Sequence, residues 1–310
     1  MISVVIPLYN KEKYIERAIK SVINQSFNDW ELIIIDDGST DNSNAIAKEY
    51  ESTKIRTVSL PNSGAASARN KGMLLSKYEY IAFLDADDEW DSRFLSSFYK
   101  ILVTNKHCKF FSSSYYIVEK DLKVRKPKFN FNSKSEIINI NLEYFKYSLY
   151  EPMVTASSVI IHNSVIDKVG YFSFGRTRSE DRDYWIRIIL YGFTLTFLNN
   201  ELAYYHREAE GRVCDTINIK PAQDLINFTD QYLEILTSSK TEVIYYIKRY
   251  LSKYAIARCI EYYRSKSYEY MCELSDKIVF SKYYVFKYFF IKLFCVSYRM
   301  RKIANLIIRS

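Results

Sequence analysis

Short apolar runs alternate with helical stripes through the first third of the chain. The run at 2–8, "ISVVIPL", is apolar and β-branched, which is typical of a parallel strand covered on both faces. Apolar residues then recur at the spacing of a helix that lies on a sheet. The alternation continues with expected strands at 30–36, 54–60 and 78–85, and with expected helices at 15–23, 41–51, 63–77 and from 94 onward. Short connections between such elements predict a parallel α/β sheet with right-handed crossovers.

The pattern becomes less regular after about residue 110. We expect paired strands at 109–121 and 122–127, a strand at 154–161, a helix at 180–191, and two short strands at 194–198 and 202–206. From about residue 220 the pattern predicts helices only. The sequence therefore indicates an α/β sheet domain followed by a helical extension.

Charge and cysteine content add a location to this organisation. The whole chain has a net charge of +8. Residues 248–310 alone carry +10, because they contain fourteen Lys and Arg but only four acids, so the preceding residues carry about −2. Five cysteines are scattered without C-x-x-C spacing, which favours free thiols in a reducing compartment. The sequence begins without a signal-peptide pattern, and we find no long uncharged apolar stretch. We therefore expect a cytoplasmic location.

Polar clusters follow each of the first four expected strands. They read "PLYN" (7–10), "DDGSTD" (36–41), "NSGAASARN" (62–70) and "DADD" (85–88). The carboxyl ends of parallel strands meet at one edge of a sheet, and ligands of such sheets bind outside that edge. We therefore expect the four clusters to converge there.

The cluster "DADD" brings like charges close together at a strand end. A hard divalent cation that binds Asp85 and Asp87 together with the oxygens of a diphosphate would relieve their repulsion. The alternative is structural: Asp91 caps the next helix and its neighbours are simply solvated.

The clusters at 36–41 and 62–70 have two interpretations each. An Asp-Gly turn with a cap from Ser39 or Thr40 explains the first, but it does not explain the tandem of Asp36 and Asp37, which could hold a uracil or a ribose. In the second cluster Ser63 is a plausible helix cap, and small residues would let the backbone approach a ligand. Arg69 could reach a nucleotide or pair with a surface acid.

The stretch "SEDRDYW" (179–185) begins an expected helix. Ser179 suits the cap position, and Glu180 and Asp181 suit the positive end of the helix dipole. A carboxylate at this place could also take a proton from an attacking hydroxyl near a diphosphate–metal site.

Together these motifs resemble the family 2 glycosyltransferases of GT-A fold, over about residues 1–206. The resemblance implies an α/β, Rossmann-like central sheet that binds a nucleotide-diphospho-sugar, with a helical C-terminal extension. It divides the chain into a catalytic domain over 1–215, with a nucleotide-binding half at 1–108 and an acceptor half at 109–215, and a basic helical region over 216–310.

The resemblance also implies three sets of site residues. The base and ribose of a nucleotide-sugar would be held by Pro7, Tyr9, Asp36 and Asp37, with Arg69 nearby. Asp85 and Asp87 would form the D-x-D motif that carries Mn²⁺ or Mg²⁺ and the diphosphate. Asp181 would be the general base. His206 is a candidate metal or phosphate partner, although a histidine at a strand end can also be a hydrogen-bonded structural residue.

The implied activity is the transfer of one sugar, with inversion, from a UDP-sugar to a hydroxyl of a lipid-linked or surface-glycan acceptor. The Q-x-x-R-W motif of the processive synthases is absent, so we expect a single transfer. Two alternatives stay open: a nucleotidyltransferase on a similar sheet, and a non-catalytic scaffold that binds a membrane or a polyanion. We expect no nucleic-acid partner, because no nucleic-acid-binding module accompanies the charge.

The last segment, 282–310, contains no acid and combines several basic residues with apolar ones. Phe286, Phe289, Phe290, Leu293 and Phe294 are expected on one side of a helix. This composition suits a helix that lies in the interface of an anionic membrane, so we expect peripheral attachment to the inner face of the cell membrane. The alternative is a helix that packs its aromatic stripe against the catalytic domain.

Overall fold

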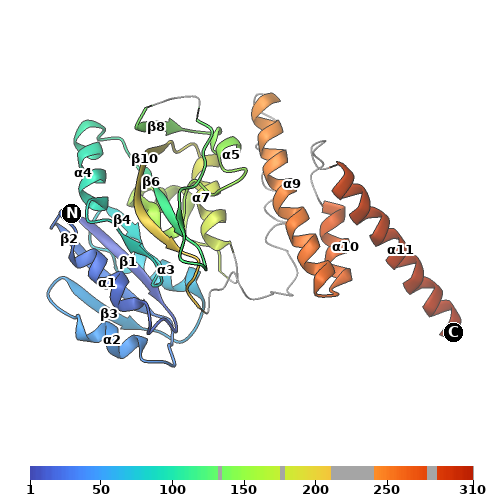
Figure 1. Cartoon of the computed structure of the whole chain (residues 1–310), viewed down its shortest axis with the longest axis horizontal. Coiled ribbons are helices and arrows are strands. Elements are labelled where there is room, and N and C mark those ends of the chain that lie inside the picture. The colour runs from blue at the N-terminus through green and yellow to red at the C-terminus, as the bar shows by residue number, and fades with distance from the viewer. Residues whose placement is uncertain (132–134, 175–178, 211–240, 278–284, 310) are drawn as a thin grey trace. The chain divides into compact units, whose positions relative to one another are not determined.

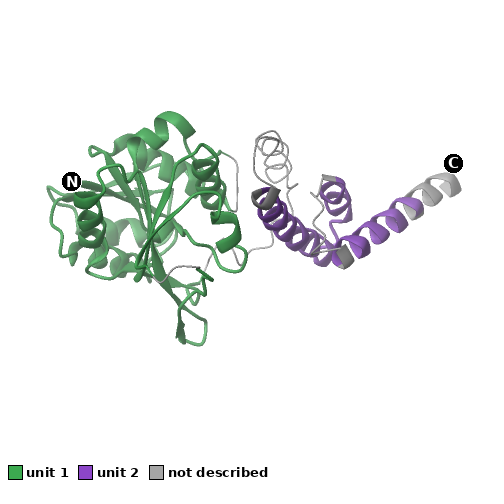
Figure 2. Cartoon of the chain, turned by 90° about the horizontal axis from the view of Figure 1, so that it is seen from above, with its two compact units in different colours: residues 1–213 green, residues 214–310 purple. Residues whose placement is uncertain are grey.

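The structure is a computed structural model that describes residues 1–131, 135–174, 179–210, 241–277 and 285–309. The chain divides into two compact units, residues 1–213 and 214–310 (Figure 2). The division falls between 211 and 240, outside the described residues. The roles assigned to 1–215 and 216–310 remain predictions.

Unit 1 alternates strands and helices along the chain, as Figure 1 shows by label. Its first half contains β1 (Ile2–Leu8), α1 (Ile15–Ile23), β2 (Trp30–Asp36), α2 (Ser43–Glu49), β3 (Ile55–Ser59), α3 (Ala65–Leu75), β4 (Tyr80–Phe83), β5 (Glu89–Trp90) and α4 (Phe94–Thr104). Its second half contains β6 (Phe110–Val118), β7 (Val124–Arg125), β8 (Ile137–Ile140), α5 (Tyr144–Tyr147), the 3₁₀ turn η1 (Ala156–Ser158), β9 (Val159–His162), α6 (Asn163–Val169), α7 (Glu180–Leu190) and β10 (Leu195–His206).

The strands described in unit 1 form one ten-stranded sheet. The order is β3-β2-β1-β4-β9-β6-β10-β5, with β7 beside β6 and β8 beside β10. The first four neighbours are parallel, and β9 then runs antiparallel to both β4 and β6. The predicted α/β class is confirmed, and the carboxyl ends of β1, β2, β3 and β4 share one edge as expected.

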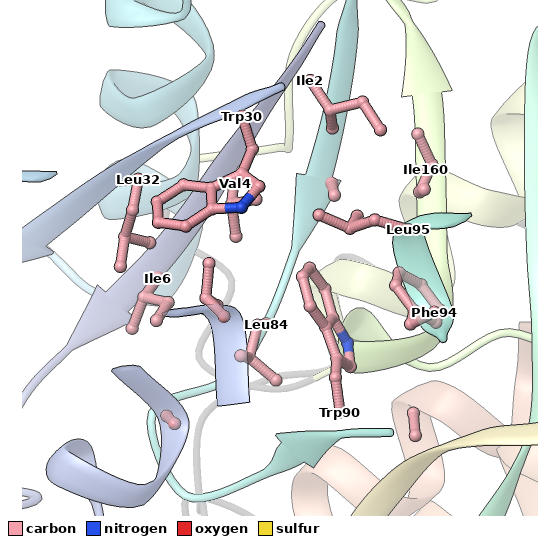
Figure 3. Close-up of a cluster of buried hydrophobic side chains, with 14 of the residues drawn as sticks. Ile2, Val4, Ile6, Trp30, Leu32, Leu84, Trp90, Phe94, Leu95 and Ile160 are labelled. Carbon is pink, nitrogen blue, oxygen red and sulfur yellow. The ribbon is translucent and has the colours of Figure 1, made fainter. Parts of the chain in front are cut away.

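Helices cover both faces of this sheet. On one face, α1 and α4 bury their apolar stripes against β1, β2 and β4, and Figure 3 shows part of this core around Trp30, Trp90 and Phe94. On the other face lie α3 and α7, where Trp185 of α7 contacts Phe83 of β4. Gly72 lets α3 approach β1 closely, because a Cβ there would lie 2.2 Å from the Cγ1 atom of Val5. The two helices on this second face carry candidate site residues.

Three local expectations differ from the structure. The two short strands at 194–198 and 202–206 are one strand, β10, whose register against β6 shifts around Glu201. The expected strand at 154–161 is shorter, because its first half forms η1. Ser63 and Ser179 do not act as side-chain caps: the N-cap of α3 is Gly64, with φ +91°, and Ser179 adopts a left-handed φ of +58° before α7.

Unit 2 consists of helices α9 (Thr241–Arg264), α10 (Tyr268–Lys277) and α11 (Val285–Arg309) over its described residues. Each helix contributes one buried free thiol to their common core: Cys259, Cys272 and Cys295. The remaining cysteine of this unit, Cys214, lies outside the described residues. Within the described part of the chain, each helix is too short or too polar to cross a membrane.

Candidate active site

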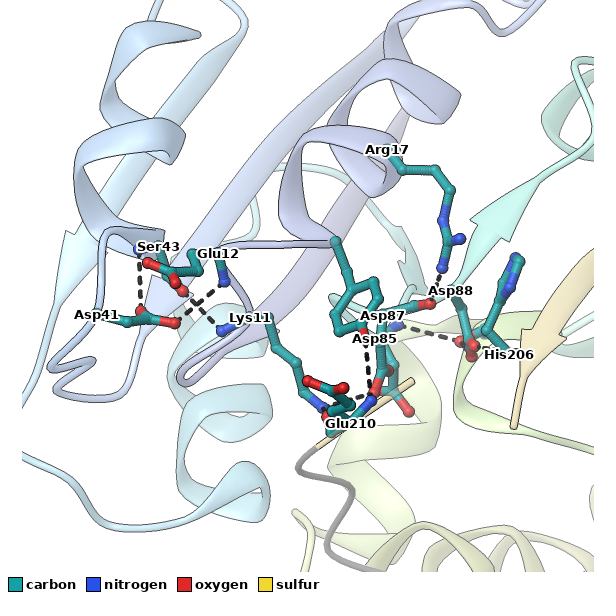
Figure 4. A network of polar contacts seen from close by, with 12 residues as sticks. Lys11, Glu12, Arg17, Asp41, Ser43, Asp85, Asp87, Asp88, His206 and Glu210 are labelled. Atoms are coloured by element: carbon teal, nitrogen blue, oxygen red, sulfur yellow. Dashed lines mark hydrogen bonds and ion pairs between the residues drawn. The ribbon is translucent and has the colours of Figure 1, made fainter. Parts of the chain in front are cut away.

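The loops at the carboxyl edge of the sheet hold one another in place. Asn10, directly after β1, has a φ of +50°, and its side-chain Oδ1 accepts a hydrogen bond from the Thr40 backbone N–H at 2.8 Å. The backbone N–H of Lys11 donates to Ser43 Oγ at 2.7 Å. Figure 4 shows this network continuing through Glu12. The loops after β1 and β2 therefore form one connected floor.

The tandem aspartates after β2 are buried in this floor. Asp37 accepts two backbone N–H bonds, from Ser63 at 2.9 Å and from Gly64 at 2.7 Å. Asp36 accepts the backbone N–H of Ser39 at 3.1 Å and a side-chain bond from Asn44. Both aspartates are almost fully buried. Their carboxylates therefore fix the loops that precede α2 and α3, and their role in holding the base or ribose of a nucleotide remains a prediction.

The aspartates after β4 have different surroundings. Asp85 Oδ1 forms an ion pair with Arg69 at 2.6 Å, and Asp87 Oδ2 forms one with Lys11 at 2.8 Å. Their side chains are 29% and 16% exposed, respectively. Each carboxylate thus keeps partial access to solvent and is balanced by a cation. Figure 4 shows Lys11 reaching Asp87 from the floor.

The next residue, Asp88, is a structural member of the same cluster. It is buried, accepts a hydrogen bond from the hydroxyl of Ser157, and accepts the backbone N–H of His206 at 2.8 Å. Burial raises the pKa of Asp88 well above its usual range, and the charges of Asp87 and Asp85 raise it further. Asp88 therefore joins the β4 end to the end of β10.

His206 lies at the end of β10 between two acids. Its Nε2 is 2.9 Å from Glu89, and its Nδ1 is 2.5 Å from Glu208. Among the described residues these two acids are the hydrogen-bond partners of its ring, and Asp85 and Asp87 are not. The structure thus places His206 beside the acidic cluster through its backbone. Its role as a metal or phosphate partner remains a prediction.

Arg69 connects the β4 end to the start of α7. Arg69 is 3% exposed, and its guanidinium pairs with Asp85 at 2.6 Å and with Glu180 at 2.8 Å. Burial would lower the pKa of Arg69, but the carboxylates of Asp85, Glu180 and Asp181 raise it overall, so the side chain stays charged. Arg69, which was expected to contact a nucleotide, therefore links the acidic segment after β4 to the acidic start of α7.

Asp181 follows Glu180 in the first turn of α7 and is half-buried. The pKa of Asp181 is raised to about 6 overall. Burial raises this pKa most, the neighbouring Glu180 carboxylate raises it further, and the charge of Arg69 lowers it. A carboxylate with this pKa is ionised at neutral pH and is a stronger base than an ordinary aspartate. Its chemistry therefore fits proton abstraction.

The predicted nucleotide residues after β1 are accessible. Tyr9 is 46% exposed, and Pro7 is half-buried at the end of the strand. An exposed aromatic ring at the carboxyl edge of the sheet is suited to stack on a base. Tyr9 and the acids after β4 thus lie at the same edge, on adjacent strands.

Sequence reasoning missed two cations at this edge. Lys11 pairs with Asp87, and Arg17 of α1 donates to the backbone carbonyl of Asp87 at 2.5 Å. The signal for Lys11 was available, because it directly follows the polar cluster after β1. Arg17 had no such signal, because the pattern marks its helix only as an amphipathic one.

The donor set at the β4 end fits a hard divalent cation. Mg²⁺ and Mn²⁺ take carboxylate oxygens, and Mg²⁺ is usually bound by one or two carboxylates plus phosphate oxygens. Asp85 and Asp87 offer two carboxylates of this kind with partial exposure. Among the described residues, no group of three or more His, Cys, Asp or Glu side chains is placed to hold a metal ion without further ligands. The fit is therefore to a metal held jointly by the protein and a diphosphate.

Comparison with known proteins identifies the family. The sequence model of glycosyl transferase family 2 matches residues 3–170. The chain belongs to glycosyl transferase family 2. The resemblance seen in the strand-end motifs is thereby confirmed, and the protein is a glycosyltransferase.

Relatives of this family 2 chain are named as glycosyltransferases. TuaG of Bacillus subtilis, named for teichuronic acid biosynthesis, is 32% identical over 208 residues, which are 66% of this chain and 78% of TuaG. WfaP of Escherichia coli is 30% identical over 214 residues, 67% of this chain and 78% of WfaP. WfaP is named as a UDP-Glc:α-D-GlcNAc-diphosphoundecaprenol β-1,3-glucosyltransferase.

Solved structures confirm the GT-A fold. Residues 1–349 of Staphylococcus aureus TarS, in complex with UDP-GlcNAc, align with a TM-score of 0.70 at 17% identity. The alignment covers 89% of this chain and 81% of the TarS chain. This family 2 chain therefore has the expected fold.

Proposed function

We propose that the protein is an inverting, metal-dependent glycosyltransferase that moves one sugar from a UDP-sugar to an acceptor hydroxyl. The observation that carries this proposal is the buried bridge from Asp85 through Arg69 to Glu180. It sets the acids suited to a metal–diphosphate next to the helix start that holds Asp181. A binding scaffold would have no need of a base beside such a site.

The chain offers groups for each part of the donor. Tyr9 presents its ring for the base, and Lys11 presents a positive charge beside Asp87 for the diphosphate. Asp85 and Asp87 would hold Mn²⁺ or Mg²⁺, which would supply positive charge to the departing diphosphate. UDP as the nucleotide is supported by the UDP-GlcNAc bound to TarS and by the UDP-Glc in the name of WfaP.

Asp181 supplies the base for the acceptor. The acceptor hydroxyl gives its proton to the Asp181 carboxylate as its oxygen forms a bond to the anomeric carbon. The bond from that carbon to the diphosphate oxygen breaks on the opposite face, and the electron pair leaves with UDP. A single displacement of this kind inverts the anomeric centre. The pKa of about 6 keeps Asp181 ready to accept the proton at neutral pH.

The proposal extends to the acceptor and the location. We place the reaction in the cytoplasm, at the inner face of the cell membrane, on a lipid-linked or surface-glycan acceptor. Support comes from relatives: WfaP is named for a diphosphoundecaprenol-linked acceptor, and TuaG for teichuronic acid biosynthesis.

The test is a product assay with Mn²⁺ and a panel of UDP-, GDP- and dTDP-sugars. We expect release of UDP from one or more UDP-sugars, and loss of that release in Asp181→Asn. Release of pyrophosphate from a nucleoside triphosphate and a sugar phosphate would instead identify a nucleotidyltransferase. Silence across the panel, together with no binding of any nucleotide, would contradict catalysis and favour a scaffold.

A further inference from the structure

One face of helix α11 packs against the other helices of unit 2. Cys295 is 2% exposed in the core shared with α9 and α10. The ring of Phe294 lies 5.2 Å from those of Tyr263 and Tyr268, and Tyr298 lies 5.3 Å from Tyr268. Phe294 therefore belongs to this inward face and not to the apolar side predicted from the sequence. The side chain of Phe286 lies outside the described residues.

The opposite face of α11 exposes large apolar side chains. Phe289, Leu293, Val296 and Met300 follow one another at steps of four, three and four residues, which places them on one stripe over three turns. Each is 56–63% exposed, and Phe290 beside them is 67% exposed. We call these five residues the α11 stripe. A continuous apolar surface of this kind marks an interaction site.

Basic residues border the α11 stripe. Lys292 and Arg299 both pair with Asp276 of α10, each at 2.6 Å, so one acid is shared between two cations. Lys287, five residues before Lys292, is exposed. The segment 282–310 has no acid of its own. The stripe is thus apolar in the middle and positive at its margin.

This combination selects one occupant. An anionic bilayer offers an apolar interior and negative headgroups, which match the stripe and its basic margin. A second copy of the chain would bring another set of cations against the first. A nucleic acid would leave the apolar stripe unmatched.

We infer that the α11 stripe docks on an anionic phospholipid bilayer, with the helix lying in the plane of the interface. The choice of the inner face of the cell membrane rests on the proposed function. The docking surface itself is inferred from the exposed residues of α11 and their charge. The helix would hold the enzyme where a lipid-linked acceptor is presented.

The experiment is flotation of the full-length chain with two kinds of vesicles. One kind contains equal parts phosphatidylcholine and phosphatidylglycerol, and the other contains phosphatidylcholine alone. The test variant is Leu293→Glu with Val296→Glu, at positions that are 56% and 58% exposed. The matched control is Leu74→Glu with Val103→Glu in unit 1, at helix positions that are 63% and 60% exposed.

We expect the native chain and the control to float with the anionic vesicles, and both to bind weakly to phosphatidylcholine. The test variant should partition at least about tenfold less, because it loses apolar contact and gains two negative charges. Circular dichroism should show equal helix content in both variants. Equal flotation of test and control, or no flotation of the native chain, would overturn the inference.

Light scattering adds an outcome that would also overturn it. If the native chain is an oligomer and the Leu293→Glu, Val296→Glu variant a monomer, the stripe binds a second copy. Binding of UDP to the same samples, measured in parallel, separates the two claims: UDP binding without flotation rejects only the membrane surface, whereas flotation without UDP binding rejects only the proposed function.

Discussion

The ends of β2 and β4 carry similar acidic pairs with different surroundings. Asp36 and Asp37 after β2 are buried, and backbone N–H groups and Asn44 occupy their oxygens. Asp85 and Asp87 after β4 are partly exposed and pair with cations. The difference teaches that carboxylates behind a strand can either build the loops of a site or carry its charge. Their burial and their hydrogen-bond partners tell the two apart.

The largest expected effect comes from the β4 end. Asp87→Asn should lower the rate of sugar transfer by about 10²- to 10³-fold, because a metal–diphosphate would lose a charged ligand. The free energy of unfolding should change by only about 1 kcal/mol, because the asparagine oxygen can still accept from Lys11 and the repulsion between Asp87 and the buried Asp88 is relieved. Rate assays and urea unfolding check the two effects. A large loss of stability with an unchanged rate would make the β4 end structural.

The pH dependence tests the base that adjoins the β4 end. Asp181 must be ionised to accept a proton, and its pKa is raised to about 6. The rate should therefore be flat above about pH 7, fall to about half at pH 6, and then fall about tenfold per pH unit to about one hundredth at pH 4. Initial rates over this range check the profile, with circular dichroism to confirm folding. A rate that stays constant down to pH 4 would exclude Asp181 as the base.

The β2 end should respond in stability. Asp37→Asn replaces one of two accepting oxygens by an N–H₂ group that faces a backbone donor, so a buried N–H loses its partner. We expect a loss of about 2 kcal/mol in the free energy of unfolding, measured in urea. If stability is unchanged but UDP binding is lost, Asp37 reads the nucleotide directly, and the contrast with the β4 end disappears.

The smallest effect is expected at Tyr9, on the strand between the two ends. Tyr9→Ala should weaken UDP binding about tenfold through loss of stacking and leave the unfolding midpoint unchanged, because the ring is 46% exposed. Calorimetric titration with UDP measures the affinity, and Tyr9→Phe is the matched control that should retain it. Equal affinity for Tyr9→Ala would place the base elsewhere on the edge.

Much of the fold could be predicted from the sequence. The apolar periods predicted the four parallel strands and the helices between them, so the shared edge of their carboxyl ends followed. Strand boundaries were less predictable: the sequence predicted two strands, at 194–198 and 202–206, whereas a register shift around Glu201 lets β10 continue as one strand. The prediction that Ser63 and Ser179 cap helices through their side chains was wrong. Backbone conformation at these positions depends on the neighbouring loops, which the sequence pattern does not specify.

The candidate site was predictable in its members but not in their partners. The motifs predicted that Asp37, Asp85 and Asp181 lie at the carboxyl edge of the sheet. The hydrogen bonds that Asp37 accepts from the loop before α3 depend on loop geometry, which the hydrophobic periodicity of the sequence does not specify. Arg69 and Glu180 are 111 residues apart in the chain. Their pairing follows only from the packing of α3 and α7 on the same face of the sheet.

Binding of UDP with Mn²⁺ to the native chain, Asp87→Asn and Asp37→Asn is the most direct test of the central claim. In a thermal-shift measurement, a ligand at 100 times its Kd adds about 2.7 kcal/mol of stability. The account predicts a metal-dependent shift for the native chain, loss of that shift in Asp87→Asn, and a retained shift from a lower starting midpoint in Asp37→Asn. A shift that persists in Asp87→Asn and does not require Mn²⁺ would contradict the account.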